Sequence, residues 1–378
     1  MLPIHLSPIA IALLAGLLLF VIIQLCYHIV VFAKLLKLPK KPEYTGKWQP
    51  VSIIVCAQSE YDHLQVLVPA LLNQQYSEFE IVLVDDASWD KTTDYFETLQ
   101  STEPRIKSVF ITDDMKKNAK GKKLALTLGI KAAKHELLLF TDADCLPNSE
   151  HWITEMVKPY HTNPATEIVL GYSPFAKRHT FVNLMAQMEN ILTASSYFGY
   201  AMNRNPYMGV GRNLSYKKSL FFSVKGFANH HHIASGDDDL FIQDAANSQN
   251  TAVCVIPQAF VNTYAKKTFG EWFAQKVRHN YVGKYYKRKH RSQLGFFGVT
   301  QALVWAFLLA CIIYEPTRYW GLILLGIFWL IKIPLMYQIF RKLKRATYAF
   351  WLPLFDFLFV FYNLVFGAVT AFGKQKKW

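Results

Sequence analysis

Cysteine is scarce in this sequence, and its five copies form no Cys-x-x-Cys pair. Cys26 and Cys311 lie in apolar runs, whereas Cys56, Cys145 and Cys254 lie in strand-like or polar contexts. Zinc sites and disulfide frameworks need cysteines at regular spacings, so neither is predicted. The three cysteines outside the apolar runs indicate a reducing compartment such as the cytosol.

Charged residues are also few, at 18%, and the 27 acidic residues are outnumbered by 41 Lys and Arg. Hydrophobic residues reach 52% and aromatic residues 15%, which predicts a membrane component. Much of the basic excess flanks apolar runs, at 34–41, 284–291 and 341–345. This placement is typical of membrane topology, so we expect membrane lipids and no nucleic acid as partners.

The amino terminus lacks the basic start and cleavage site of a signal peptide. The apolar run from Ile9 to Phe32 is long enough to cross a hydrocarbon core of about 30 Å. Lysines follow this run, which predicts an outside amino terminus and a cytosolic chain after Lys34. Three more apolar runs cover 296–313, 320–339 and 351–372. Four crossings would place the basic tail outside, so we expect two to three crossing helices near the carboxyl terminus.

These features predict a transmembrane helix over residues 1–33, a cytosolic domain over 34–293 and a membrane region over 294–378. In the middle domain, β-rich runs begin at Val51, Glu80, Ile106 and Glu136, and helical patterns separate them. Continuous apolar strands that alternate with helices predict an α/β fold, with a mostly parallel sheet and helices on both faces. Ligands bind such sheets beyond the carboxyl ends of the strands.

Asp142 and Asp144 follow the strand that begins at Glu136. Two carboxylates at this spacing can hold Mg²⁺ or Mn²⁺, which would bridge to nucleotide phosphates. A plain polar loop or a helix cap is the alternative interpretation. The preceding buried strand favours the metal site.

Asp85 and Asp86 end the strand that begins at Glu80. Adjacent carboxylates repel each other unless they bind something, and a base N–H or ribose hydroxyl would serve. The alternative is a cap for the next helix, shared with Ser88 or Asp90. The residues alone leave both interpretations open.

Asp237, Asp238 and Asp239 precede a helical pattern. Neighbouring like charge raises the pKa of a carboxyl group, which suits a general base. The alternative is an acidic helix start stabilised by the helix dipole. A metal site at the preceding His230–His232 is a weaker alternative, because three consecutive side chains cannot all point one way.

Gln275 and Arg278 are spaced to share a helix face. Arginine suits a diphosphate because its guanidinium is planar and permanently charged. For the basic stretch 284–291, contact with anionic lipid is the preferred interpretation. Lys122 and Lys123 are candidates either for phosphate binding or for a solvated helix face.

In this order, the motifs resemble the inverting family 2 glycosyltransferases with the GT-A fold, over roughly Val51 to Arg288. The segments that carry the resemblance are VSIIVCAQSE from Val51, VDDAS from Val84, TDADC from Thr141, GVGRNLSYKKSLFFSVKGF from Gly209, GDDDLF from Gly236 and QKVRH from Gln275. The last is similar to the Q-x-x-R-W motif of membrane-integrated members such as cellulose, hyaluronan and chitin synthases and ceramide glucosyltransferase.

The resemblance implies roles for eight residues. The catalytic base is Asp238, with Asp239 as the alternative register, and the cation is held by Asp142 and Asp144. The donor nucleotide is bound by Asp85, Asp86, Gln275 and Arg278. His279 stands where the motif has Trp, and Asp237 stands where Glu is usual.

The resulting hypothesis is a metal-dependent transferase in the bacterial inner membrane, with its catalytic domain in the cytosol. It would move a sugar from a nucleotide-sugar donor, UDP-linked by resemblance, to a hydroxyl of a lipid or saccharide acceptor. A processive polysaccharide synthase is the second interpretation. A nucleotide-sensing transporter or an inactive scaffold is the alternative from another class.

Overall fold

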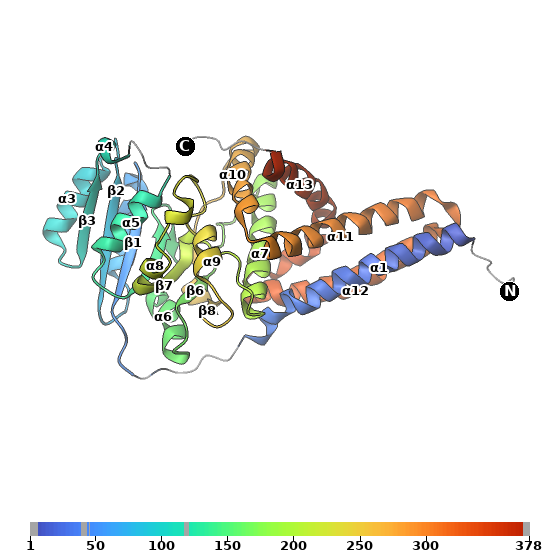
Figure 1. The fold of residues 1–378 in the computed structure, drawn as a ribbon, viewed down its shortest axis with the longest axis horizontal. Helices are drawn as coiled ribbons and strands as arrows, with labels where there is room; N and C mark the ends of the chain where they lie inside the picture. Colours follow the sequence, from blue (N-terminus) through green and yellow to red (C-terminus); the bar gives the residue numbers. More distant parts are fainter. Residues whose placement is uncertain (1–6, 39–43, 45, 117–120, 373–378) are drawn as a thin grey trace. The chain divides into compact units, whose positions relative to one another are not determined.

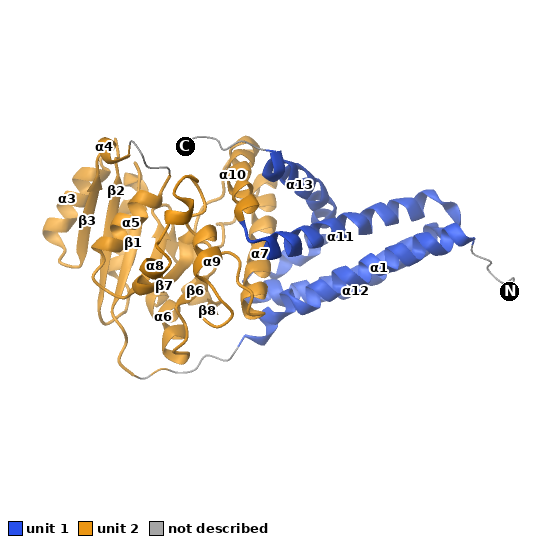
Figure 2. Cartoon of the chain, in the orientation of Figure 1, with its two compact units in different colours: residues 1–38, 286–373 blue, residues 39–285, 374–378 orange. Residues whose placement is uncertain are grey.

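The computed structural model describes residues 7–38, 44, 46–116 and 121–372, and the chain divides into two compact units (Figure 2). Unit 1 comprises residues 1–38 and 286–373, and unit 2 comprises residues 39–285 and 374–378. Unit 2 holds the β-sheets with their helices, and unit 1 holds long apolar helices. Figure 1 labels many of the elements of both units.

A seven-stranded sheet in the order β3-β2-β1-β4-β7-β6-β8 forms the centre of unit 2. Its strands are β1 Val51–Ala57, β2 Phe79–Asp86, β3 Ile106–Ile111, β4 Leu137–Asp142, β6 Ile168–Gly171, β7 Leu214–Lys217 and β8 Thr251–Cys254. β7 runs antiparallel to β4 and β6, while the pairs β1–β2, β1–β4, β2–β3 and β6–β8 are parallel. A second sheet pairs β5 Leu146–Pro147 with β9 Val261–Asn262.

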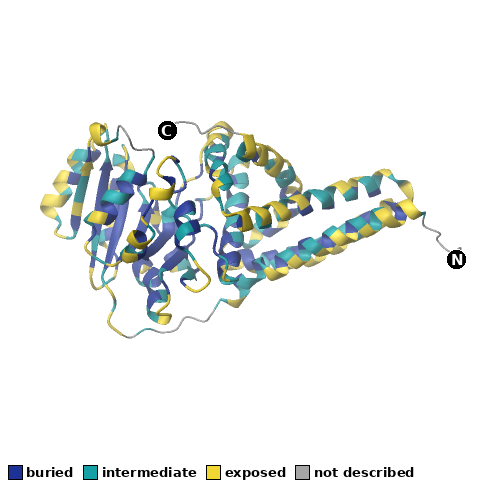
Figure 3. Cartoon of the chain, viewed as in Figure 1, coloured by how far each residue is buried: buried dark blue, intermediate teal, exposed yellow. Residues whose placement is uncertain are grey.

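The central strands are mostly apolar because both faces of the sheet are covered. All seven residues of β1 are buried (Figure 3). Ile53 and Val55 belong to one hydrophobic cluster that includes residues of α2 and α6. On the other face, Ile54 lies so close to Gly129 of α5 that an added methyl group there would meet it at 2.9 Å. The predicted α/β fold, mostly parallel with helices on both faces, is confirmed.

The helices of unit 2 are α2 Tyr61–Leu72, α3 Thr92–Thr102, α4 Asp113–Lys116, α5 Lys123–Ala132, α6 Trp152–Thr162, α7 Phe181–Met202, α8 Lys218–Ser223, α9 Asp239–Ala245 and α10 Phe269–Val282. Short 3₁₀ segments include η2 Gly211–Asn213, η3 Ala228–His230 and η4 Pro257–Ala259. The parallel strands β1 to β4 lie where the apolar runs predict them. The strands β6, β7 and β8 have only four residues each, too few to give a clear sequence pattern.

Among its described residues, unit 1 contains four helical segments long and apolar enough to cross a membrane, at Pro8–Lys37, Arg288–Ile313, Glu315–Lys342 and Ala346–Phe372. The long helices within them are α1 Pro8–Val30, α11 Arg288–Ile313, α12 Arg318–Lys342 and α13 Leu352–Phe372. Shorter 3₁₀ segments are η1 Phe32–Lys37, η6 Glu315–Thr317 and η7 Ala346–Trp351. The structure therefore has three such segments after unit 2, at the upper end of the predicted two to three.

The helices of unit 1 bury a small apolar core and leave many large apolar side chains exposed. Leu17 of α1, Leu308 of α11 and Phe328 of α12 meet in this core. Outward-facing residues such as Leu330 and Leu364 are 75% and 62% exposed. Apolar surface of this extent is unusual on a soluble protein and is typical of a surface that meets lipid.

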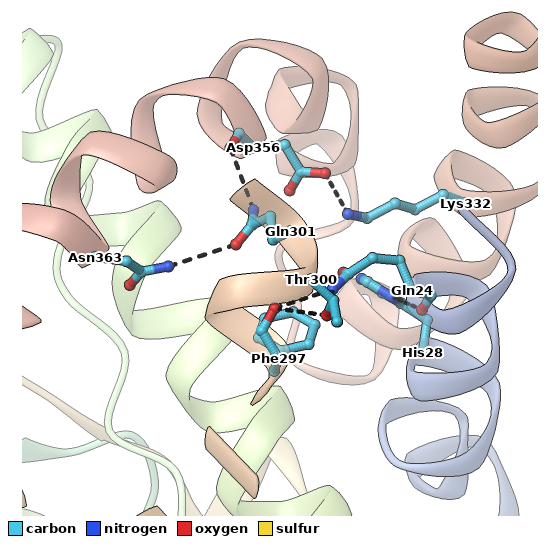
Figure 4. Close-up of polar contacts among 8 residues, drawn as sticks. All are labelled: Gln24, His28, Phe297, Thr300, Gln301, Lys332, Asp356 and Asn363. Atoms are coloured by element: carbon cyan, nitrogen blue, oxygen red, sulfur yellow. Dashed lines mark hydrogen bonds and ion pairs between the residues drawn. The ribbon is translucent and has the colours of Figure 1, made fainter. Parts of the chain in front are cut away.

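Polar side chains also meet inside unit 1 (Figure 4). Lys332 of α12 forms an ion pair with Asp356 of α13, and the two side chains are 1% and 6% exposed. Gln301 of α11 donates to the backbone oxygen of Asp356 at 3.2 Å. Nearby, Gln24 of α1 donates to Thr300 Oγ1 at 2.8 Å. Each long helix of the unit therefore contributes a polar group to its interior.

The Lys332–Asp356 pair gives a stability prediction, because removal of one partner leaves a buried charge without its counter-charge. We expect Lys332→Met to lower the free energy of unfolding by about 3–5 kcal/mol. The double variant Lys332→Met/Asp356→Leu should recover most of this loss, since it removes both charges. Thermal unfolding in detergent measures the difference, with exposed Lys342→Met as the control. A double variant less stable than either single variant would contradict this account.

Candidate active site

The predicted acidic motifs meet at the carboxyl ends of β1, β2 and β4. In the parallel register, Ala57 of β1 lies opposite Asp85 of β2, and Cys56 lies opposite Asp142 of β4. These two motifs lie more than fifty residues apart in the sequence, and strand pairing alone brings them to one edge of the sheet. This is the edge at which parallel sheets bind their ligands.

The buried thiol of Cys56 shows that the third motif belongs to the same place. The pKa of Cys56 is raised to about 12, mainly by burial; the charge of Lys122 lowers it, and the charges of Asp142, Asp86 and Asp237 raise it. Carboxylates from β2, β4 and the loop before α9 thus surround the end of β1. These acids are far apart in the sequence, and only long-range contacts in the fold bring them together.

Asp142, Asp144 and Cys145 place one ligand atom each within 4.8 Å of one another. Within the described ranges, this is the only group of three or more His, Cys, Asp or Glu side chains that meets this criterion. Burial raises the pKa of Cys145 well above its usual value, with Asp142 and Asp144 adding to the effect, so Cys145 stays a neutral thiol. Two half-exposed carboxylates remain, and oxygen ligands of this kind fit Mg²⁺ or Mn²⁺.

Lys122 forms an ion pair with Asp142, which resolves part of the open question about Lys122 and Lys123. Partial burial raises the pKa of Asp142, but Lys122 and, to a smaller extent, Arg212 lower it below its usual value. The Lys122 pKa is raised by the same pair, against the effect of burial. Asp142 is therefore a carboxylate that faces the ammonium group of Lys122.

Asp85 and Asp86 are adjacent but have different surroundings. Asp85 is buried and accepts hydrogen bonds from Ser88 N at 2.9 Å and from Thr93 Oγ1 at 2.5 Å. Its two oxygens therefore hold the loop and the start of α3. Asp86 is 14% exposed and lies 3.1 Å from the ammonium nitrogen of Lys116. Asp86 is the member of the pair with an accessible oxygen for a ligand.

Asp238 caps α9 and is held at both carboxylate oxygens. Oδ2 accepts from Gly211 N at 2.8 Å, and Oδ1 accepts from Asp239 N at 2.8 Å. Burial and the neighbouring Asp237 charge raise the pKa of Asp238 to about 6, although these hydrogen bonds lower it. A carboxylate with this pKa is suited to take up a proton near neutral pH.

Asp239 is the first residue of α9, so it is the neighbour that donates to Asp238 rather than the residue held by Gly211. The preceding histidines point to separate partners. His230 lies 3.6 Å from Asp244, and His231 is hydrogen-bonded to Ala228 O at 2.9 Å. These contacts give no common centre for a histidine metal site.

Lys123 holds the loop that leads to Asp238. Its ammonium group donates to three backbone oxygens, of His230, Ile233 and Ser235, at 2.7–2.9 Å. Burial lowers the pKa of Lys123 to about 8, although Asp237 and Asp238 raise it. Gly121, at φ +65°, lies so close to the same loop that an added Cβ would come within 2.0 Å of Ala234 O. Lys123 therefore has a positioning role.

Gln275 and Arg278 lie on α10. This helix begins with a capping box formed by Thr268 and Glu271. Lys276, in the same motif, forms a buried ion pair with Glu189 of α7. Desolvation lowers the pKa of Arg278 from its usual value. The roles of Gln275 and Arg278 in donor binding stay predictions.

Comparison with known families gives two matches. Residues 139–366 match glycosyl transferase family group 2, and residues 52–224 match glycosyl transferase family 2. Both matches include the Asp142–Asp144 segment and the Gly211–Asn213 segment, and the longer match includes Asp238 and α10.

Two curated proteins show the range of relatives. The 4,4'-diaponeurosporenoate glycosyltransferase of Staphylococcus haemolyticus is 25% identical over 48% of this chain and 48% of its own length. The UDP-Glc:alpha-D-GlcNAc-diphosphoundecaprenol beta-1,3-glucosyltransferase WfaP of Escherichia coli is 29% identical over 35% of this chain and 48% of its own. The chain thus spans about half the length of these curated relatives.

Among solved structures, the chain is similar to the mannosyltransferase PcManGT of Pyrobaculum calidifontis, in complex with GDP-Man and Mn²⁺. The TM-score is 0.55 at 18% identity, over 92% of this chain and 98% of the other. At this level of identity the similarity shows a shared fold, which agrees with the predicted GT-A class.

The carboxylate pair gives a direct prediction about metal binding. Asp142→Asn and Asp144→Asn should each weaken Mn²⁺ binding by about tenfold or more, because a charged oxygen ligand is lost. Electron paramagnetic resonance of free Mn²⁺ measures the change, with exposed Asp94→Asn as the matched control. Equal Mn²⁺ affinity in all four proteins would exclude these residues as ligands.

Proposed function

This chain belongs to glycosyl transferase family group 2, and we propose that it transfers a sugar from a nucleotide-sugar donor to a hydroxyl of a lipid or lipid-linked acceptor. The observation that carries the proposal is the meeting of the Asp85–Asp86 and Asp142–Asp144 motifs at the carboxyl ends of β2 and β4, where Lys123 holds the loop before Asp238. In this proposal these residues supply a cation site, a nucleotide-facing carboxylate and a proton acceptor. A sensor or scaffold has no need for this combination.

Asp238 acts as the general base in this proposal. Its carboxylate removes the proton from the acceptor hydroxyl, whose oxygen attacks the anomeric carbon from the face opposite the leaving group. The bond between that carbon and the phosphate oxygen breaks, and its electron pair stays on the nucleoside diphosphate. The amides of Gly211 and Asp239 fix the orientation of the base. A single displacement of this kind inverts the anomeric configuration.

Asp142 and Asp144 would hold the Mg²⁺ or Mn²⁺ ion. Such a cation supplies Lewis-acid stabilisation of charge on the departing diphosphate. In this scheme Asp86 accepts a hydrogen bond from the nucleoside, with Asp85 behind it. Gln275 and Arg278 would contact the diphosphate from α10, as the motif resemblance implies.

A UDP-linked donor and a lipid-linked acceptor are supported by the name of the WfaP relative. The exposed apolar helices of unit 1 support an integral membrane protein, and the basic residues that follow α1 support a cytosolic catalytic unit. His279, in place of an aromatic platform, favours a single transfer over processive polymer synthesis. The bacterial names of these relatives support the inner membrane as the location.

A donor screen tests the function. The full chain in nanodiscs should release nucleoside diphosphate from one UDP- or GDP-sugar, with Mn²⁺ or Mg²⁺ and membrane lipid present, and EDTA should stop the release. Radiolabel should move into the lipid fraction. A high-molecular-weight product would indicate the polymer synthase instead. Absence of turnover with every donor, despite nucleotide binding, would indicate a sensor or scaffold.

The role of Asp238 predicts a pH profile. Because the base works as a carboxylate, kcat/KM should rise with pH through about 6 in the wild type. Asp238→Asn should lose at least about 100-fold in kcat and keep nucleotide binding, since Asn fills the same space. Asp237→Asn should move the midpoint to lower pH, because it removes the neighbouring negative charge. Full activity of Asp238→Asn would refute the assignment.

A further inference from the structure

Arg212 lies at the level of the cation site, although no motif assignment gave it a role. It belongs to η2, directly before β7. β7 pairs antiparallel with β4, and Leu214 lies opposite Phe140. The 3₁₀ segment that contains Arg212 directly precedes this pairing, and the charge of Arg212 lowers the pKa of Asp142, so the two side chains lie near each other.

The backbone around Arg212 is fixed from both sides. On one side, Gly211 N donates to Asp238 at 2.8 Å. On the other, the fully buried Asn213 accepts from Trp152 Nε1 at 3.0 Å and donates to Tyr172 O and Ala259 O at 2.8 Å each. The position of Arg212 is therefore set by the sheet and by the proposed base together.

Within the described residues, the guanidinium of Arg212 forms no close ion pair, although its charge helps to lower the pKa of Asp142. Its Cζ lies 5.2 Å from the centre of the Phe175 ring, and its Nε is buried without a hydrogen-bond acceptor in that part of the structure. The nearby Asp142 is paired with Lys122 instead. A buried donor without an acceptor is unfavourable, so this arrangement favours a ligand that supplies anionic oxygens.

We infer that Arg212 binds the diphosphate of the nucleotide-sugar donor, an inference that rests on the proposed function. A guanidinium presents two parallel donors that match phosphate oxygens, and the ring of Phe175 orients its plane. As the sugar leaves, the electron pair remains on the diphosphate, where the charge of Arg212 stabilises it. The segment 211–213 thus contributes twice: the Gly211 amide orients the proposed base, Asp238, and the Arg212 guanidinium binds the leaving diphosphate.

Isothermal titration of the full chain in nanodiscs with Mn²⁺-UDP and Mn²⁺-GDP tests this inference. Arg212→Gln should weaken binding of the preferred nucleotide by about tenfold to a hundredfold. Arg212→Lys should fall between, because it keeps the charge and loses the planar fork. Arg178→Gln is the matched control, since exposed Arg178 also lies over an aromatic ring, at 5.3 Å from Tyr264. The affinity for Mn²⁺ alone should not fall in any of these variants.

The outcomes separate this inference from the function on which it rests. Wild-type protein that binds neither nucleotide overturns both. Wild-type binding that Arg212→Gln leaves unchanged overturns the role of Arg212 alone. A rise in the KM of a phosphate-bearing lipid acceptor, with nucleotide binding unchanged, assigns Arg212 to the acceptor and likewise overturns it. If Arg212→Gln does not fold, nucleotide affinity of Arg212→Lys within about twofold of wild type decides against the inference.

Discussion

Repulsion among carboxylates at one edge of the sheet is the constraint on which the rest of unit 2 depends. Parallel strand pairing brings Asp86 and Asp142 together, and the loop before α9 adds Asp237. Neighbouring carboxylates of like charge stay ionised only when cations or hydrogen bonds offset their repulsion. Lys116 offsets Asp86 and Lys122 offsets Asp142. The elements that carry these lysines, α4 and the start of α5, are therefore part of the site.

Asp238 differs from the other acids because its partners are backbone amides and not lysines. Neutral donors leave the effect of burial largely in place, so the pKa stays raised to about 6. Lys123 helps to position Asp238: its ammonium group holds the preceding loop through backbone oxygens and not through the Asp238 carboxylate. One edge of the sheet thus contains acids that are paired with lysines and one acid whose pKa is raised to about 6.

Much of this was predictable from the sequence, and the remainder depends on contacts between distant segments. Buried strands appear in the sequence as apolar runs. The positions of β1 to β4, and of the carboxylates at their ends, could therefore be predicted from the local sequence pattern. The choice between Lys122 and Lys123 could not be made locally, because adjacent residues on a helix differ in direction and only the fold shows what each one meets. Arg212 lies in a segment that carries the family resemblance, but its proximity to Asp142 depends on the antiparallel pairing of a four-residue strand and could not be predicted. The buried Lys276–Glu189 pair was likewise hidden, because its partners lie on separate helices.

The paired charges inside unit 1 also bear on how the chain is made. In the membrane assignment that we propose, Lys332 and Asp356 lie on consecutive helices, and each alone would resist transfer from the translocon into lipid by about 2.5–3.5 kcal/mol. Once neutralised by each other, the two side chains lose most of that penalty. We therefore expect α12 and α13 to partition into the bilayer together, as a hairpin, during synthesis. If translation is arrested before α13 is made, α12 should be retained at the translocon.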